Sequence, residues 1–353
     1  MRTIHVGVIG WGLGGRIFHA PMIRAVPCLQ LAAIVERSGD SARAAYPDVQ
    51  VVRSVGELLA IKSIELVVVT TPNTTHLDLA RQCLQAGRHV VMDKPFAPTT
   101  AEAAEMVRIA QECGRLITVY QNRRWDGDFQ TLRRVIQDGS LGRLVLFESH
   151  MERYRPEVKA ETWREIPTPG SGLWFDLGPH LLDQAFVLFG PPESMTAELR
   201  AERDGTVVDD AFDVVLHYPK LRVLLRSNLL TCVTGPRFRL NGTQGSFVKY
   251  ASDPQEDALK AGGMPGQPNW GQEPSENWGT LSISEGEKIT EKRIPTATGD
   301  YSRYYQNVYD AIVSGAPLDV TPEHGLDIMR ALELGMESSR RGCKLPFSRE
   351  SAR

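Results

Sequence analysis

The first 120 residues of the chain alternate short apolar runs with longer amphipathic segments. The runs are nearly continuous in apolar residues, as strands buried on both faces should be. Between them, segments such as residues 74–87 repeat apolar residues at helical spacing and end at a glycine, Gly87. This alternation predicts an α/β domain, with a doubly wound parallel sheet of the Rossmann type. The predicted strands are residues 4–10, 29–35, 49–52, 66–71, 89–92 and 116–120.

After residue 125 the pattern changes. A helix is expected over residues 129–139, and the runs that follow alternate polar and apolar residues, which is typical of half-solvated antiparallel strands. This part is predicted to be α+β, with a large, mainly antiparallel open-faced sheet and no crossover helices. We therefore place one domain at residues 1–122 and a second at 123–353, with the C-terminal helix packing back toward the first. The predicted strands are residues 144–154, 194–202, 210–219, 221–230, 237–250 and 279–294.

Two further segments complete the second half. Residues 261–279 are rich in Gly and Pro and predict a long loop, whereas residues 304–315 and 325–342 return to helical spacing. Loops of that length commonly serve as functional lids or are disordered.

Composition narrows the class of protein. The 353 residues are 42% hydrophobic and 24% charged with a formal net charge of -3, which gives no general attraction to nucleic acid or to anionic membranes. The five cysteines are scattered without a C-x-x-C pair, so neither disulfides nor a zinc site is expected. No apolar stretch approaches the roughly 20 residues of a membrane helix, and the N-terminal apolar run ends in glycines instead of a cleavage site. We therefore expect a soluble, cytoplasmic protein.

Three glycines follow the first predicted strand. Gly10, Gly12 and Gly15 form G-x-G-x-x-G at the start of a predicted helix. Glycine permits the tight turn and the close approach of backbone N–H groups to a pyrophosphate, which the helix N-terminus stabilises. A tight strand-to-helix turn could carry an isolated motif of this kind, but the surrounding βα units favour a dinucleotide-binding loop.

The end of the second strand gives conflicting signals about the cofactor. Glu36 lies where a ribose-binding carboxylate is expected, and such a group repels a 2′-phosphate. Arg37 and Ser38 follow at once, and a guanidinium beside a hydroxyl suits a 2′-phosphate. Both NAD and NADP therefore stay open, as does a simple solvated ion pair at the strand end.

Polar residues also follow the later strands, where ligands of doubly wound sheets bind. Lys94 ends a buried strand, where an ammonium group needs a partner or must reach solvent. The sequence leaves open whether the peptide bond before Pro72 or Pro95 is cis. The residues predicted here to contact the cofactor are Thr71, Pro72, Asn73, His76, Lys94, Pro95 and Asn122.

Four motifs in this order, followed by an antiparallel-sheet domain, carry a family resemblance: VIGWGLGG at residues 8–15, TTPNTTH at 70–76, MDKP at 92–95 and DLGPH at 176–180. From residue 3 to 347 the chain resembles the glucose-fructose oxidoreductase, inositol dehydrogenase and rhizopine-catabolism (Gfo/Idh/MocA) family of NAD(P)-dependent sugar dehydrogenases. Residues 120–132, 147–158 and 169–185 look most like its NADP-dependent scyllo-inositol dehydrogenase branch. The family's E-K-P motif stands here as Asp93-Lys94-Pro95, which keeps the lysine and shortens the acid.

The resemblance implies a catalytic set of Lys94, Asp176 and His180. Oxidation of a secondary alcohol releases a hydroxyl proton, so His180 is the expected general base and Lys94 would stabilise the developing alkoxide. Asp176 would orient the substrate or the imidazole. Pro179 is expected at the first helical position, which places His180 in the first turn. A metal-ligand and a purely structural interpretation of His180 also exist, but no other Cys or His has ligand spacing nearby, so no metal is predicted.

Substrate recognition is expected in the second domain. Arginine side chains and aromatic faces suit polyol hydroxyls, although both also line ordinary domain interfaces. The expected activity is hydride transfer between the nicotinamide and a cyclic polyol or sugar, inositol first. The alternatives are a non-catalytic dinucleotide-binding sensor and a reductase of an unsaturated substrate. The resemblance further implies a homo-oligomer, a dimer or tetramer, through the C-terminal sheet. The predicted substrate-binding residues are Lys94, Arg153, Arg155, Trp163, Asp176 and His180.

Overall fold

The computed structural model describes residues 2–158 and 165–349 of the chain, which divides into two compact units. The first unit comprises Met1–Asn122, Gln255–Trp270 and Asp300–Leu326. The second unit comprises Arg123–Pro254, Gly271–Gly299 and Asp327–Arg353. Two later segments of the chain therefore belong to the first unit in addition to its N-terminal part.

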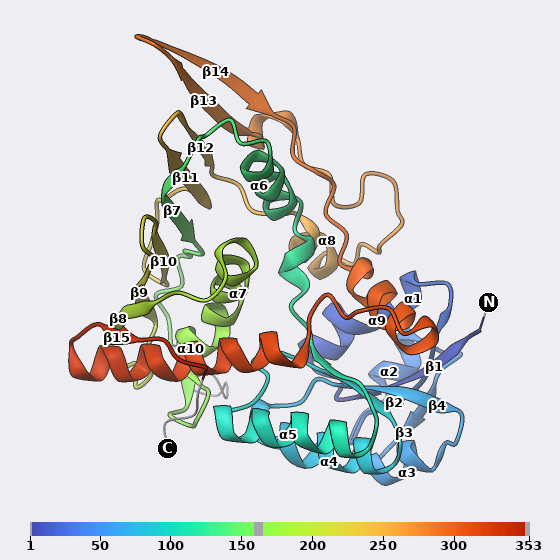
Figure 1. Ribbon diagram of the computed structural model, residues 1–353. Helices are drawn as coiled ribbons and strands as arrows, with labels where there is room; N and C mark the ends of the chain where they lie inside the picture. The colour runs from blue at the N-terminus through green and yellow to red at the C-terminus, as the bar shows by residue number, and fades with distance from the viewer. Residues whose placement is uncertain (1, 159–164, 350–353) are drawn as a thin grey trace. The chain divides into compact units, whose positions relative to one another are not determined.

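The first unit is built on a parallel six-stranded sheet (Figure 1). Its strand order, β3-β2-β1-β4-β5-β6, reverses direction at β1, which makes the edge beside β1 the expected ligand site of a doubly wound fold. The predicted parallel sheet is confirmed, and each of the six apolar runs contains one strand. The strands are β1 (Ile4–Ile9), β2 (Leu29–Val35), β3 (Gln50–Val52), β4 (Ile64–Val69), β5 (His89–Met92) and β6 (Ile117–Val119).

Helices pack on this sheet through small and branched apolar side chains. Val6, Val67 and Val68 have no exposed surface, in keeping with a sheet that is covered on both faces. Helix α4 packs beside α5, and α1 packs beside α9 (Figure 1). The helices and helical turns are η1 (Gly14–His19), α1 (Ala20–Ala25), α2 (Ser41–Ala45), α3 (Val55–Ala60), η2 (Asn73–Thr75), α4 (His76–Gln85), α5 (Thr100–Glu112), α8 (Gln255–Lys260) and α9 (Ser302–Ser314).

The second unit contains a nine-stranded sheet in the order β14-β13-β12-β11-β7-β10-β9-β8-β15. The predicted mainly antiparallel sheet is confirmed, and helix α7 packs against β9 and β10. The strands are β7 (Leu144–His150), β8 (Ser194–Arg200), β9 (Ala211–His217), β10 (Arg222–Asn228), β11 (Phe238–Gly242), β12 (Gly245–Lys249), β13 (Gly279–Glu285), β14 (Lys288–Ile294) and β15 (Leu345–Pro346). The helices are η3 (Asn122–Trp125), α6 (Gly127–Gln137), α7 (Gly172–Phe189), η5 (Ser275–Asn277) and α10 (Pro322–Arg341). The first residues of η3 and of α10 still belong to the first unit.

One expectation about this sheet was wrong. Strands β7 and β10 pair in parallel, so the connection from β7 through α7 to the β8-β9-β10 meander includes a crossover helix. The alternating pattern of each strand is the same whether its neighbour runs parallel or antiparallel, so the sequence did not reveal the direction.

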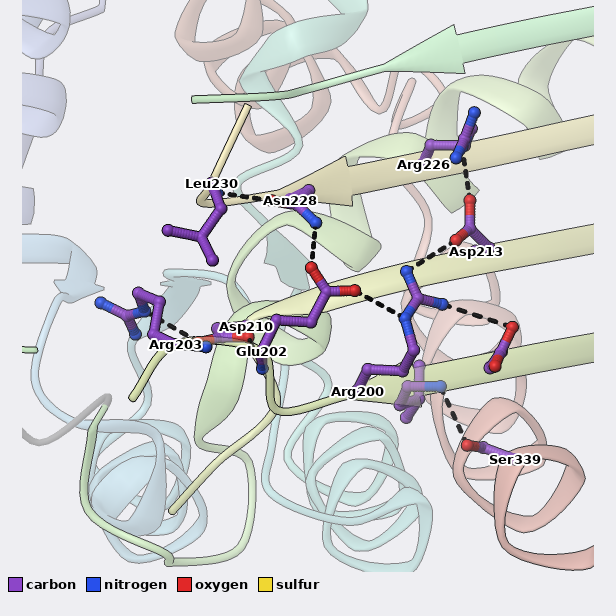
Figure 2. Close-up of polar contacts among 11 residues, drawn as sticks. Arg200, Glu202, Arg203, Asp210, Asp213, Arg226, Asn228, Leu230 and Ser339 are labelled. Carbon is purple, nitrogen blue, oxygen red and sulfur yellow. Dashed lines mark hydrogen bonds and ion pairs between the residues drawn. The ribbon is translucent and has the colours of Figure 1, made fainter. Parts of the chain in front are cut away.

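The two faces of the sheet differ in chemistry. Phe147, Phe212 and Phe238 are fully buried on one face, whereas the alternate positions of β8, β9 and β10 carry charges. Arg200 donates to Asp213 across the strands at 2.8 Å, and Arg226 contacts the same carboxylate (Figure 2). This row of ion pairs explains the polar half of the alternation that predicted the strands.

The predicted helices at the C-terminus are present as α9 and α10, and α10 begins three residues earlier than the pattern indicated, with Pro322 as its first residue. The Gly- and Pro-rich residues 261–279 follow α8 and contain only the short turn η5, as expected for a loop.

His89 makes the stability of the first unit pH-dependent. Its Nδ1 accepts the backbone N–H of Leu116 at 3.0 Å, and burial together with the charge of Arg115 lowers the pKa of His89 to about 4. Between about pH 6.5 and pH 4 the unfolded chain binds the extra proton, so folding stability falls as the pH falls through this window. We expect His89→Gln to remove a contribution on the order of 1–3 kcal/mol from this pH dependence. Urea unfolding at several pH values measures this contribution, with His5→Gln in β1 as the control. An equal pH dependence of the unfolding free energy in wild type and His89→Gln would contradict it.

Candidate functional site

The glycine loop after β1 is closed by contacts that only glycine allows. Gly10 has a φ of +104°, and a Cβ at Gly15 would lie 2.3 Å from the carbonyl oxygen of Gly10. Gly12 differs, because a Cβ there would meet no atom within 4 Å. The loop is therefore packed against its own chain at Gly10 and Gly15 and open at Gly12, which suits the approach of a dinucleotide.

The segments after the neighbouring strands lie beside this loop. Thr70, which follows β4, donates its hydroxyl to the Gly10 carbonyl at 2.9 Å. Asp93, which follows β5, hydrogen-bonds through its N–H to Val69, and a Cβ at Gly14 would lie 2.7 Å from its Oδ2 atom. The carboxyl ends of β1, β4 and β5 thus place the glycine loop and the Asp93-Lys94 segment within one small region of the first unit.

Glu36 is used within the protein. Its carboxylate accepts the hydroxyl and N–H of Ser41 at 2.6 and 3.1 Å and the N–H of Ala42 at 3.0 Å, so it caps the start of α2. The side chain is only 7% exposed. Burial alone would raise the pKa of Glu36, but these hydrogen bonds and the charge of Arg53 hold it below its ordinary value. The carboxylate predicted to bind ribose therefore has a structural role that accounts for its charge.

Arg37 and Ser38 are exposed immediately after Glu36. The Arg53 guanidinium holds the backbone of their loop by donating to the carbonyl of Glu36 at 3.0 Å and to that of Gly39 at 2.5 Å. The guanidinium and hydroxyl of this loop are thus displayed at its surface while its backbone is held in place.

His76 ties two of the predicted cofactor loops together. Its Nδ1 lies 3.0 Å from the carbonyl oxygen of Phe96, and its Nε2 lies 3.0 Å from that of Thr71. A neutral imidazole has one N–H, so it can donate to one of these oxygens at a time. Burial lowers the pKa of His76. Both ring nitrogens face protein carbonyls, which gives His76 a bridging position between the loops. Among the other predicted residues of these loops, Asn73 and Pro95 are buried and Thr71 and Pro72 are at least partly accessible.

Lys94 begins the segment that follows Asp93, and its peptide bond to Pro95 is cis. The Lys94 N–H donates to Oδ1 of Asp93 at 2.8 Å. Lys94 is half-buried beside the glycine loop, at the edge where the predicted hydride transfer would occur.

Asp176 and His180 lie on helix α7 of the second unit, whereas Lys94 belongs to the first. Residues four apart share one face of an α-helix, which brings Asp176 and His180 together. From Gly172 to Ala185, Asp176 is the one residue that is not buried, and His180 is 5% exposed.

The predicted start of this helix was wrong. Helix α7 begins at Gly172, so Pro179 lies inside it and His180 is in its third turn instead of its first. An internal proline removes one backbone hydrogen bond and disfavours the helix, but buried packing on both sides of this segment outweighs that cost. Gly178 is packed against the ring of Trp174, where a Cβ would lie 2.6 Å from the indole.

A residue from another segment caps this helix. Asp209 accepts the N–H of Trp174 at 2.6 Å, and a Cβ at Gly172 would lie 2.2 Å from its carboxylate. Farther along α7, Arg124 forms a bidentate pair with Asp183 at 2.6 and 2.8 Å. These contacts fix the position and rotation of the helix that carries Asp176 and His180.

The remaining predicted residues are spread over the second unit. Arg153 and Arg155 follow the C-terminal end of β7, and their backbone N–H groups donate to the carbonyls of Asn228 and Leu229 at 2.9 and 2.7 Å. Arg155 is exposed and Arg153 is partly buried. Asn122, at the end of the first unit, is 6% exposed. Trp163 lies outside the described residues.

Sequence reasoning missed His19, Tyr305 and Asp209. His19 follows the glycine loop at a fixed short spacing and could have been flagged as a histidine next to the cofactor motif. Tyr305 and Asp209 reach their partners only through tertiary structure, and no local pattern indicates them.

The sheet order and the glycine loop define a Rossmann-type dinucleotide-binding protein. Two family models match the chain: "Oxidoreductase family, NAD-binding Rossmann fold" over residues 4–121 and "Oxidoreductase family, C-terminal alpha/beta domain" over residues 133–347. The chain therefore belongs to the Gfo/Idh/MocA oxidoreductase family.

Similar proteins extend over nearly the whole chain. The uncharacterized oxidoreductase YdgJ of Escherichia coli (strain K12) is 42% identical over 96% of this chain and 97% of its own. The scyllo-inositol 2-dehydrogenase (NADP(+)) IolW of Bacillus subtilis (strain 168) is 39% identical over 96% and 94%. The solved structure of yvaA from Bacillus subtilis superposes with a TM-score of 0.95 at 38% identity, over 98% of this chain and 99% of that one.

Within the described ranges, no helix is long and apolar enough to cross a membrane. Nor do three or more His, Cys, Asp or Glu side chains cluster as a metal site in the part of the chain that the structure describes.

The contrast between Gly12 and Gly15 can be tested. Gly12→Ala adds a methyl group into open space, so we expect normal folding and at least a tenfold weaker cofactor affinity, because the methyl group occupies the approach of the dinucleotide. Gly15→Ala meets the Gly10 carbonyl, so we expect a lower melting temperature as well. Thermal unfolding and fluorescence titration with NADPH measure both, and unchanged affinity in Gly12→Ala would place the dinucleotide elsewhere.

Proposed function

We propose that this protein is an NADP-dependent dehydrogenase that interconverts a secondary alcohol and a ketone of a cyclic polyol or sugar, with an inositol as the first substrate to test. The observation that carries the proposal is the position of Lys94 at the carboxyl end of β5, beside the glycine loop. A lysine there can reach an oxygen bound next to the cofactor, as the family resemblance implies.

The proposed chemistry assigns one role to each residue. Bound NADP supplies the hydride acceptor. His180 removes the hydroxyl proton, and Lys94 donates a charged hydrogen bond to the oxygen as negative charge develops on it. Asp176, one helical turn before His180 and on the same face, orients the imidazole or a neighbouring substrate hydroxyl.

The cofactor preference is proposed from the loop after β2. The carboxylate of Glu36 points to Ser41 and Ala42, so its charge is compensated inside the protein. Arg37 and Ser38 are exposed beside it, and a guanidinium with a hydroxyl binds a 2′-phosphate well. The NADP(+) in the name of the relative IolW supports the same preference.

The second unit is proposed to bind the substrate and to mediate self-association through its sheet. Support for self-association comes from the family resemblance and from the charged face of β8, β9 and β10, whose alternating signs could pair with a second copy of itself (Figure 2).

Loss of the charged hydrogen bond from Lys94 should lower turnover strongly without unfolding the protein. We expect Lys94→Ala to lower kcat by roughly 10²–10⁴-fold, the usual range for a catalytic acid, base or oxyanion donor. His180→Asn should lower kcat similarly. Its affinity for NADPH should stay within about twofold of wild type, because the predicted cofactor-binding residues of the first unit are unchanged. Steady-state rates with scyllo- and myo-inositol measure the effect, with Lys62→Ala as the control. Near-normal turnover of Lys94→Ala with a good substrate would exclude the mechanism.

The cofactor preference has a separate test. Arg37→Ala removes the proposed partner of the 2′-phosphate, so we expect kcat/KM with NADP to fall by about 10–100-fold, which corresponds to one charged hydrogen bond. The value with NAD should change little. Rates with NADP and NAD side by side provide the measurement, and an equal loss with both cofactors would show that Arg37 does not recognise the phosphate.

A further inference from the structure

His19, in the helical turn that follows the glycine loop, has no exposed surface. Its ring lies against Tyr120, with ring centroids 4.1 Å apart, and Tyr305 of α9 approaches edge-on. The Nδ1 atom of His19 is 2.6 Å from the Tyr305 hydroxyl oxygen, while Nε2 lies 3.7 Å from Oδ1 of Asp93. A buried histidine thus connects α9 to the segment that carries Lys94.

The direction of the relay follows from the chemistry of its two ends. At 3.7 Å, Nε2 of His19 and Oδ1 of Asp93 are too far apart for a hydrogen bond, but an ionised carboxylate electrostatically favours the tautomer with the proton on Nε2, facing it. In the imidazole tautomer with its proton on Nε2 alone, Nδ1 carries a lone pair that accepts the Tyr305 hydroxyl. Burial raises the pKa of Asp93, but the contact with His19 and the charge of Lys94 outweigh it and hold that pKa below its ordinary value.

Asp93 passes this arrangement on to the catalytic segment. The same Oδ1 atom that faces His19 accepts the backbone N–H of Lys94 at 2.8 Å. Its other oxygen lies against Gly14, so the carboxylate is held between the glycine loop and the Lys94 backbone. The acid that departs from the family's E-K-P motif therefore has specific partners in this chain.

We propose that Tyr305, His19 and Asp93 form a directed polar relay that positions Lys94 and keeps a negative charge beside it during hydride transfer. The relay consists of the Tyr305–His19 hydrogen bond, the electrostatic contact of His19 with Asp93, and the hydrogen bond from the Lys94 N–H to Asp93. The inference rests on the proposed catalytic role of Lys94. All three are positioning residues, because they act on the substrate only through Lys94.

The groups around the relay are defined. His19 faces Tyr120 from the end of β6, Tyr305 from α9 and Asp93 from the end of β5, and Tyr304 of α9 packs edge-on against Tyr120. Asp93 itself faces His19 and Lys94, and His76 from α4 acts on it at longer range. A change of charge at Asp93 thus acts mainly on His19 and Lys94.

The direction of the relay can be read without activity. In the unliganded protein at pH 7, long-range ¹⁵N–¹H NMR of the histidine side chains, with His19 assigned by its loss in His19→Gln, should show the proton on Nε2 and an accepting Nδ1. Tyr305→Phe should shift the Nδ1 resonance, because its donor is removed. Tyr309→Phe is the matched control, since that hydroxyl, one turn later in α9, donates to the carbonyl of Arg2 at 2.7 Å. A proton on Nδ1 of the wild type, alone or in an imidazolium, would overturn the relay.

The effect on catalysis is read from the pH profile of kcat. We expect Asp93→Asn to lower kcat at least tenfold and to move the alkaline limb of the profile to lower pH, because a neutral amide no longer favours a positive charge beside it. Asp93→Glu keeps the negative charge, so its pH profile should match that of the wild type. Tyr305→Phe should shift the alkaline limb in the same direction as Asp93→Asn, but by less. A merely structural role would lower stability or kcat without moving the limb.

The outcomes separate this inference from the proposed function. If Lys94→Ala retains turnover, the proposed function fails, whereas the NMR measurement still reads the relay. If Lys94 is required but Asp93→Asn and Tyr305→Phe keep the wild-type profile, the relay alone is excluded.

Discussion

The backbone carbonyl of Gly10 is the point around which the first unit is organised. The Thr70 hydroxyl donates to it at 2.9 Å, and Gly15 approaches it so closely that a methyl group would overlap with the oxygen. Because these contacts bring the ends of β1 and β4 against the start of η1, they also set where Asp93 and Lys94 emerge from β5. One close approach of backbone atoms thus fixes both the open side of the loop at Gly12 and the place of the predicted catalytic lysine.

The second unit holds its polar residues in a different way. Helix α7 carries Asp176 and His180 in a segment that is otherwise buried, and its ends and sides are fixed by charged groups from elsewhere in that unit. Asp209 caps its first turn, and Arg124 forms a bidentate ion pair with Asp183. Such buried charge pairs contribute little net stability, but they define one orientation of the helix, which the proposed catalytic role of Asp176 and His180 requires.

The strands of both sheets and the glycine loop could be predicted because they depend on local patterns. Buried parallel strands have continuous apolar runs, half-exposed strands alternate, and G-x-G-x-x-G has few structural solutions. The errors arose where tertiary contacts decide. The start of α7 depends on Asp209, which is 35 residues away from Trp174, and the parallel pairing of β7 with β10 leaves no trace in their alternation. The sequence likewise could not distinguish a helix-capping role of Glu36 from a ribose-binding role, because a carboxylate directly after the second strand suits either role.

We expect hydride to move directly between a ring carbon of a cyclic polyol and NADP. This transfer is tested most directly with an inositol deuterated on its ring carbons, incubated with the protein and NADP and analysed by ¹H NMR of the isolated cofactor. We expect one deuterium at C4 of the nicotinamide, on a single face, for each ketone formed. Ketone formation without deuterium in the cofactor, or no reaction with any member of a broad polyol and sugar panel under conditions where NADPH binds, would contradict it.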